Sequence, residues 1–215
     1  MGKLAVLTIV VTPFRQNCTL LFDEEQKKGV LIDPGGELPL ILEAIHKTGI
    51  TVEAAWLTHG HIDHAAAAMA AKEALGVEII GPHEDDKPFL DDLVKIAAMY
   101  GLDEPVRNCT PDRWLKDGET VFCAGHPFTV YHCPGHAPGH VIFVSEEQRF
   151  AVMGDVLFRG TVGRTDLPGG DRDTLLKSIR EKILPLGDDI IFICGHGAGS
   201  TIGEERRNNP YLQGM

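Results

Sequence analysis

The stretch Thr58-His59-Gly60-His61-Ile62-Asp63-His64 places three imidazoles and one carboxylate within six residues. It follows an apolar run, Val52–Leu57, that predicts a strand, and it precedes an alanine-rich run, Ala65–Leu75, that predicts a helix. The polar groups therefore fall on a strand-to-helix turn, where α/β proteins commonly place their chemistry. Neutral imidazole and carboxylate suit Zn, Fe(II) or Mn(II), so the turn predicts a metal site.

The spacing within this turn divides its side chains between two ions. His59 and His61 lie two residues apart, on the same side of an extended segment, so both reach one ion. Asp63 and His64 follow where the chain bends into the helix, and they face a second ion. Four side chains do not fill two catalytic sites, so we expect further ligands from elsewhere in the chain.

Three more polar residues follow predicted strands, each directly after a glycine. They are His136, Asp155 and His196. Glycine lets the backbone turn sharply and aim the next side chain inward. These residues are therefore the candidates to complete the site. His132 and His140, four residues either side of His136, are expected to be structural or to support a ligand.

Composition limits the classes of partner. The formal net charge of −11 argues against nucleic acid and against an anionic membrane surface. No apolar run reaches the length of a spanning helix, and the apolar start is typical of a first strand rather than a signal peptide. Five scattered cysteines without a CxxC motif indicate reduced thiols and a cytoplasmic location.

Strand-like and helix-like segments occur in both halves of the 215-residue chain. We expect one domain, residues 1–215, made of two β-rich halves, about 1–110 and 111–215, which meet in the irregular stretch 102–118. Two mixed sheets with helices outside them, an αββα sandwich, is the expected fold. The main predicted strands are Leu4–Val11, Cys18–Phe22, Gly29–Ile32, Val52–Leu57, Val77–Ile80, Glu119–Cys123, Phe128–Tyr131, Val141–Val144, Phe150–Met153 and Asp189–Cys194. The predicted helices are Leu38–Lys47, Ala65–Leu75, Pro88–Tyr100 and Asp173–Ile183.

The ordered motifs His-x-His-x-Asp-His, Pro-Gly-His, Gly-Asp and Gly-His-Gly resemble those of the metallo-β-lactamase superfamily. The resemblance extends over nearly the whole chain and implies the αββα fold and a dinuclear metal site. By motif, one ion would be held by His59, His61 and His136, and the other by Asp63, His64 and His196, with Asp155 bridging the two.

A closer resemblance, to short bacterial glyoxalase II-like hydrolases, rests on Asp33-Pro34-Gly35, Gly163-Arg164-Thr165-Asp166 and the ending Glu205–Leu212. It implies hydrolysis of S-lactoylglutathione, a hydroxyacylglutathione thioester, by a hydroxide shared between two divalent ions, Zn or alternatively Fe or Mn. Asp63 would orient this nucleophile. Longer glyoxalase II enzymes carry a C-terminal helical region that binds glutathione. Only 19 residues follow His196, so we expect no separate domain of that kind and leave the preferred thiol open.

Three residues are candidates for supporting roles. Arg159 and Arg164, in a glycine-rich loop, are expected to contact a substrate carboxylate, although Arg164 has Asp166 as an alternative partner. Asp33 is either a turn former or a partner of a ligand histidine. The oligomeric state is not determined by the sequence.

Other functions share this scaffold. Persulfide dioxygenases have the same His-x-His-x-Asp-His and Gly-Arg-Thr-Asp segments, but they use one iron and oxygen, with two histidines and the residue at the position of Asp155 as ligands. Lactonase or β-lactamase activity is a second alternative. A metal-binding domain without catalysis is a third.

Overall fold

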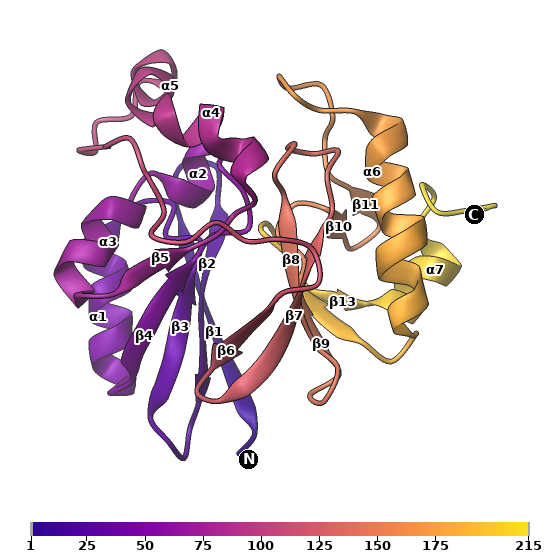
Figure 1. The fold of residues 1–215 in the computed structure, drawn as a ribbon, viewed down its shortest axis with the longest axis horizontal. Coiled ribbons are helices and arrows are strands. Elements are labelled where there is room, and N and C mark those ends of the chain that lie inside the picture. The colour runs from indigo at the N-terminus through magenta and orange to yellow at the C-terminus, as the bar shows by residue number, and fades with distance from the viewer. Residues whose placement is uncertain (1, 215) are drawn as a thin grey trace.

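The computed structural model describes residues 2–214, which form four layers in the order helix, sheet, sheet, helix (Figure 1). This is the predicted αββα architecture. In the first sheet, β1–β3 are antiparallel, and β4 and β5 join in parallel. The strand order follows the chain: β1 (Leu4–Val11), β2 (Gln16–Asp23), β3 (Lys28–Ile32), β4 (Thr51–Trp56) and β5 (Glu78–Ile80).

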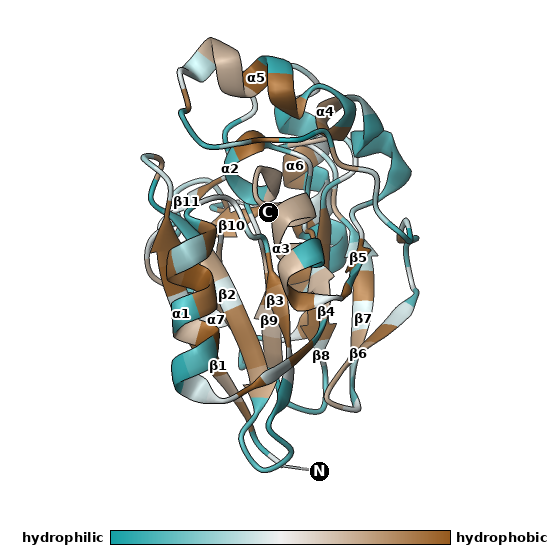
Figure 2. Ribbon diagram, turned by 90° about the vertical axis from the view of Figure 1, so that its left-hand side faces the viewer, coloured by the Kyte–Doolittle hydropathy of each residue, from teal (hydrophilic) through white to brown (hydrophobic). Residues whose placement is uncertain are grey.

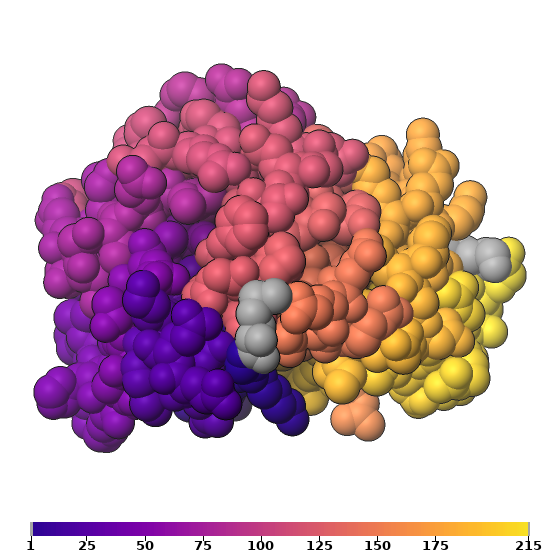
Figure 3. All heavy atoms as spheres, turned by 60° about the horizontal axis from the view of Figure 1, so that its bottom comes forward, coloured from indigo at the N-terminus to yellow at the C-terminus, as the bar shows by residue number. Residues whose placement is uncertain are grey.

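The second sheet is built from residues after 119 and is also mixed. Its order is β13-β12-β9-β8-β7-β6, and only the β12–β9 pair is parallel among these strands. The strands are β6 (Thr120–Cys123), β7 (His126–His132), β8 (Val141–Ser145), β9 (Phe150–Val152), β12 (Ile191–Ile193) and β13 (Ser200–Thr201). In Figure 3 the first half of the chain, coloured indigo to magenta, adjoins the second half, coloured salmon to yellow.

Helices cover the outer faces of both sheets, and no helix formed by residues 2–214 is long and apolar enough to cross a membrane. On the first side α1 (Leu38–Thr48) and α3 (Ala68–Leu75) lie along the sheet, whereas α2 (Ile62–Ala65), α4 (Lys87–Asp91) and α5 (Leu93–Tyr100) lie at its upper end in Figure 1. On the second side α6 (Arg172–Ser178) continues as a π-helical turn, Ile179–Ile183, and α7 (Ile202–Asn208) follows β13.

Several local predictions were wrong. The helix predicted for Ala65–Leu75 is divided between α2 and α3, because the Ala67 N–H donates to the Pro34 carbonyl (3.0 Å) instead of continuing the helix. The helix predicted for Pro88–Tyr100 is likewise divided at Asp92, between α4 and α5. The loop after Asp155 contains a short hairpin, β10 (Leu157–Phe158) and β11 (Thr161–Val162). No helix was predicted after Ile183, yet the chain end forms α7, which is capped by the Thr201 hydroxyl.

Apolar side chains between the two sheets hold the layers together. Trp56 of β4 lies with its ring 4.7 Å from that of Phe143 and 5.6 Å from that of Phe128, centroid to centroid. All three side chains are fully buried, and burial of such a ring contributes about 1.5–3 kcal/mol. Figure 2 shows the apolar strands inside and the polar faces of the helices outside. This core fixes the two sheets relative to each other.

Backbone hydrogen bonds join the two sheets at the end where the His-rich turn lies. The Val141 N–H, at the start of β8, donates to the Thr58 carbonyl (2.8 Å). Nearby, the Asn17 N–H of β2 donates to the Gly195 carbonyl (2.7 Å), just after β12. The turn after β4 therefore faces the loops of the second sheet across a short, fixed gap.

Candidate metal centre

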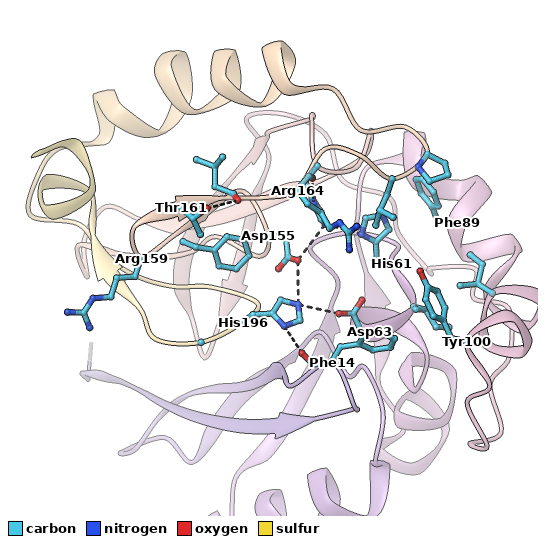
Figure 4. A pocket seen from close by; sticks show the side chains of 18 of the residues that line it. Phe14, His61, Asp63, Phe89, Tyr100, Asp155, Arg159, Thr161, Arg164 and His196 are labelled. Atoms are coloured by element: carbon cyan, nitrogen blue, oxygen red, sulfur yellow. Dashed lines mark hydrogen bonds and ion pairs between the residues drawn. The ribbon is translucent and has the colours of Figure 1, made fainter. Parts of the chain in front are cut away.

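The seven side chains predicted to bind metal lie together at this end of the sheets, as Figure 4 shows for four of them. The turn after β4 and the start of α2 carry four of the residues, and separate loops after β7, β9 and β12 each supply one. The full set is His59, His61, Asp63, His64, His136, Asp155 and His196.

Three imidazoles form the first group. The rings of His59, His61 and His136 lie 4.6–4.9 Å apart, centroid to centroid, and each pair is close to perpendicular. Nδ1 of His61 faces Nε2 of His136 at 2.9 Å. One potential ligand atom from each residue lies within 4.8 Å of the others, a spacing that a single metal ion can span.

The second group contains Asp63, His64 and His196, whose potential ligand atoms also lie within 4.8 Å of one another. Oδ2 of Asp63 is 3.2 Å from Nε2 of His196 and 3.9 Å from Nε2 of His64. Asp155 lies between the groups, with its carboxylate oxygens 3.4–3.5 Å from Nε2 of His64, His136 and His196. One carboxylate thus contacts nitrogens of both groups.

Hydrogen bonds fix the orientation of four of the five imidazoles through Nδ1. His64 donates to Oδ2 of Asp33 (2.9 Å), and His59 donates to the Thr58 hydroxyl (3.0 Å), which itself donates to Asp33 (2.7 Å). The other two rings, His136 and His196, donate to backbone carbonyls, of Arg164 (2.8 Å) and Phe14 (3.1 Å). In the neutral form of each ring the proton is then on Nδ1, which leaves the Nε2 lone pair for a metal ion, as is usual for metal-binding histidines.

The pKa shifts differ between the two groups. Burial lowers the pKa of His61 to about 3 and that of His59 well below its usual value, with the neighbouring imidazoles adding to the effect. These rings are neutral, the form that binds metal. Burial would also lower the pKa of His196, but hydrogen bonds that Asp155 and Asp63 accept from its protonated ring outweigh burial and raise the value to about 9. The carboxylates thus concentrate negative charge where a cation would be attracted.

Buried atoms without hydrogen-bond partners test whether the site fits metal ions. Among residues 2–214, these atoms include Nε2 of His59, Nε2 of His64 and Oδ1 of Asp155. A buried polar atom without a partner costs about 1–3 kcal/mol, so such atoms rarely occur together without a reason. Their concentration on the facing edges of the seven side chains fits two divalent ions.

Two glycines allow these side chains to approach one another. Gly154 precedes Asp155 and adopts φ +49°, a conformation that favours glycine. Gly195 precedes His196 and acts by a different route, because a Cβ there would lie 2.5 Å from Cε1 of His64 and closer still to Asp155. The glycine before His196 therefore supplies space rather than an unusual turn.

The residues predicted for supporting roles lie around the centre. Asp33 is buried and accepts hydrogen bonds from the Thr58 N–H (2.7 Å), from the Thr58 hydroxyl and from His64. Its carboxylate therefore orients the His64 ring. Arg159 and Arg164 both line the cavity described below. The guanidinium of Arg164 makes a bidentate pair with Asp166, both bonds 2.8 Å, as the sequence allowed.

Other contributors were not predicted. Asp86 is buried and accepts from the Gly60 N–H (2.7 Å) and the Gly139 N–H (2.5 Å), so it joins the His-rich turn to the loop of His136. Its place in the run Glu84-Asp85-Asp86 gives no signal of this. The Phe14 carbonyl has no signal either, since any residue has a carbonyl. His140 accepts from the Asp155 N–H (2.9 Å), which agrees with a supporting role.

A cavity of about 720 Å³ opens beside the centre. Five of the seven side chains line it, together with residues from α4, α5, the β10–β11 hairpin and the loop before α6. Most of the remaining lining is apolar or aromatic, and includes Phe14, Phe89, Tyr100, Phe158 and Leu167. A small organic substrate can therefore reach the centre.

The chain is similar to known proteins in sequence and in fold. A family model described as the metallo-β-lactamase superfamily matches residues 11–196. Over 205 residues the chain is 47% identical to hydroxyacylglutathione hydrolase from Haemophilus influenzae, covering 95% of this chain and 96% of that protein. The crystal structure of the B3 metallo-β-lactamase BLEG-1 is similar with a TM-score of 0.89 and 33% identity, covering 98% of this chain and 100% of that one. TTHA1623, in a di-iron-bound form, is similar with a TM-score of 0.85 and 37% identity, covering 96% and 100%.

Proposed function

The chain is a hydrolase of the metallo-β-lactamase superfamily, and we propose that it cleaves thioesters of the hydroxyacylglutathione class at a centre of two divalent metal ions. The position of Asp155 carries the proposal, because its carboxylate lies within 3.5 Å of nitrogens from both histidine groups. The identity to a hydroxyacylglutathione hydrolase, which extends over nearly the full length of both chains, supports the substrate class.

We assign the ligands by these groups. His59, His61 and His136 would hold one ion, while Asp63, His64 and His196 would hold the other, and Asp155 would bridge them. When bound, two such ions supply a water of lowered pKa and a Lewis acid for the substrate carbonyl. Zn is the ion we propose, with Fe or Mn as alternatives, since His and Asp ligands accept all three. The iron in TTHA1623 supports keeping Fe in this set.

The side chains themselves orient the reaction. Oδ2 of Asp63 lies 3.2 Å from Nε2 of His196 and its side chain faces the cavity, so Asp63 can accept a hydrogen bond from the attacking water and fix its direction. Thr58 and Asp33 hold the rings of His59 and His64 in place, which keeps their lone pairs aimed at the ions. The thiol of the leaving group has a pKa of about 8.5, so it can leave as the thiolate without a strong general acid to protonate it.

A thioester panel on protein of known metal content tests the proposal. Metal-loaded protein should hydrolyse S-lactoylglutathione, and Asp155→Ala should reduce both the metal per chain and kcat/KM. We expect a loss of more than about 100-fold, because partners that only orient a ligand are already worth up to that much. Asp173→Ala, an exposed residue on α6, is the matched control. Full activity of Asp155→Ala with both metals retained would contradict the bridging role.

β-Lactam hydrolysis is a second candidate, favoured by the 33% identity to BLEG-1 over 98% of the chain. The same panel should include a β-lactam and a lactone, and we expect both to be poorer substrates than the thioester. Oxygen uptake with glutathione persulfide by protein holding one iron per chain would instead show a dioxygenase. Tight metal binding with no turnover of any substrate would show a binding domain.

A further inference from the structure

The two ends of the cavity differ in chemistry, and from this we infer that the enzyme prefers thioesters whose acyl group is apolar and larger than lactoyl. The acyl group would lie against Phe89, Met99 and Tyr100. The inference rests on the proposed thioester hydrolysis and names which substrates of that class the site selects.

The end formed by α4 and α5 is apolar. The Phe89 ring stands edge-on to His61, with centroids 5.2 Å apart, so it adjoins the first metal group directly. Tyr100 packs edge-on against Phe14, with ring centroids 5.4 Å apart, and both residues line the cavity. In Figure 4, Phe89 and Tyr100 lie on the same side of the centre, beyond His61 and Asp63.

Part of this apolar surface is open to solvent. Met99 is 77% exposed and Tyr100 is 53% exposed, although both line the cavity. An apolar acyl group bound there would remove from water both its own surface and that of Met99 and Tyr100. Each added methylene should therefore raise kcat/KM about three- to fourfold, until the acyl group fills the apolar end of the cavity. A lactoyl group is too short to cover this surface, and its hydroxyl would find few partners there.

The opposite end, formed by the β10–β11 hairpin, carries the cation. Arg159 lines the cavity and its guanidinium has no ion-pair partner among residues 2–214. The guanidinium of Arg164, which lies next to His61 in Figure 4, is instead paired with Asp166. Figure 4 shows Arg159 at the outer edge, on the far side of His196 from Tyr100, with its guanidinium directed outward from the centre. A thiol arm that ends in carboxylates, as glutathione does, would meet Arg159 at this edge. The reacting carbonyl then lies over the centre, and the acyl group is left with the apolar end.

An acyl series tests the inference with the thiol held constant. S-Acetyl-, S-butanoyl-, S-hexanoyl- and S-phenylacetylglutathione should be compared with S-lactoylglutathione on protein of one metal content. We expect kcat/KM to rise with acyl length and to exceed the lactoyl value for hexanoyl and phenylacetyl. Met99→Gln, a nearly isosteric change at an exposed helical position, should flatten this slope without loss of folding. Val94→Ala is the matched control, since Val94 is 49% exposed on the same helix and does not line the cavity.

A second arm varies the thiol with the acyl group held constant. Arg159→Gln should lower kcat/KM for S-hexanoylglutathione several-fold and leave it unchanged for the neutral S-hexanoyl-N-acetylcysteamine. A value of kcat/KM that is highest for lactoyl and falls with acyl length would overturn the inference and leave thioester hydrolysis standing. No turnover of any thioester by metal-loaded protein would overturn the proposed function itself.

Discussion

The two halves of the chain contribute to the centre in different ways. The first half supplies four of the seven side chains from one turn, within six residues, and anchors them through Thr58 and Asp33 of the same sheet. The second half supplies three side chains from three separate loops, spread over 61 positions from His136 to His196. The first contribution is local, whereas the second exists only when β7, β9 and β12 come together in one sheet. Perturbing each half should therefore have different consequences.

The largest effect is expected where the second half depends on close approach. In Gly195→Ala the new Cβ would lie 2.5 Å from Cε1 of His64 and closer to Asp155, so the bridging position cannot form without a shift. We expect less than two metal ions per chain and a loss in kcat/KM of about 100-fold or more, as a displacement of about 1 Å can cause. Metal analysis and steady-state kinetics measure these two quantities.

Gly118→Ala is the matched control for this change. Gly118 has φ +80° and open space around it, so alanine there brings only backbone strain, about 1–2 kcal/mol. If both variants lost metal equally, general destabilisation rather than the gap between His64 and Asp155 would explain the effect.

Metal binding by the first half should depend on the hydrogen bonds that Asp33 accepts. In Asp33→Ala the His64 ring loses its hydrogen bond, and the Thr58 N–H and hydroxyl lose their acceptor. Metal affinity should fall about 10–100-fold, as is usual when a residue that orients a ligand is removed. Competition with a chelator measures the affinity.

Asp23→Ala separates this effect from lost stability. Asp23 is also fully buried and accepts several hydrogen bonds, among them one from His126, but it lies at the opposite end of β2 from the centre. We expect it to lower the free energy of unfolding and to leave metal affinity unchanged. Weaker metal binding in Asp23→Ala would mean that the centre responds to any loss of stability.

Asp86 joins the two halves, and its effect should be intermediate. Each of its two carboxylate oxygens accepts a hydrogen bond from a backbone N–H, of Gly60 or Gly139. In Asp86→Asn one of these N–H groups would face the side-chain NH₂, which cannot accept a hydrogen bond. The expected loss is about 1–3 kcal/mol in the free energy of unfolding. Urea denaturation of the metal-free protein measures it without interference from metal release.

The pH dependence of this loss provides a second measurement. Burial raises the pKa of Asp86 to about 6, from 3.8 in a model peptide, so the folded protein holds the proton more tightly than the unfolded chain. Its contribution to stability is then fully present below about pH 4 and is lost as the pH rises through about 6, a change of about 3 kcal/mol. The stability difference between the wild type and Asp86→Asn should therefore grow on acidification, and a difference independent of pH would contradict the raised pKa.

The same contrast explains what could be predicted from the sequence. The turn from Thr58 to His64 is dense enough to indicate metal by itself, and the strands around it follow from their apolar runs. Asp86 and the Phe14 carbonyl could not be predicted, because their roles arise only when distant segments meet. The β10–β11 hairpin has two residues in each strand, too few for alternation to show. The apolar end of the cavity could not be predicted either, because apolar residues in a helix are usually part of the core.

The smallest effect is expected at Arg164, which contacts the centre through its backbone carbonyl rather than through its side chain. The side chain is 60% exposed and bound to Asp166, while its carbonyl holds Nδ1 of His136. Arg164→Gln removes an exposed ion pair and keeps the carbonyl, so stability should change by less than about 1 kcal/mol. If the guanidinium serves only this pair, kcat/KM should stay within about threefold for glutathione thioesters and for neutral thiols alike. A loss confined to the glutathione thioesters would instead assign Arg164 to substrate binding, at a position next to His61 in Figure 4 and distant from Arg159.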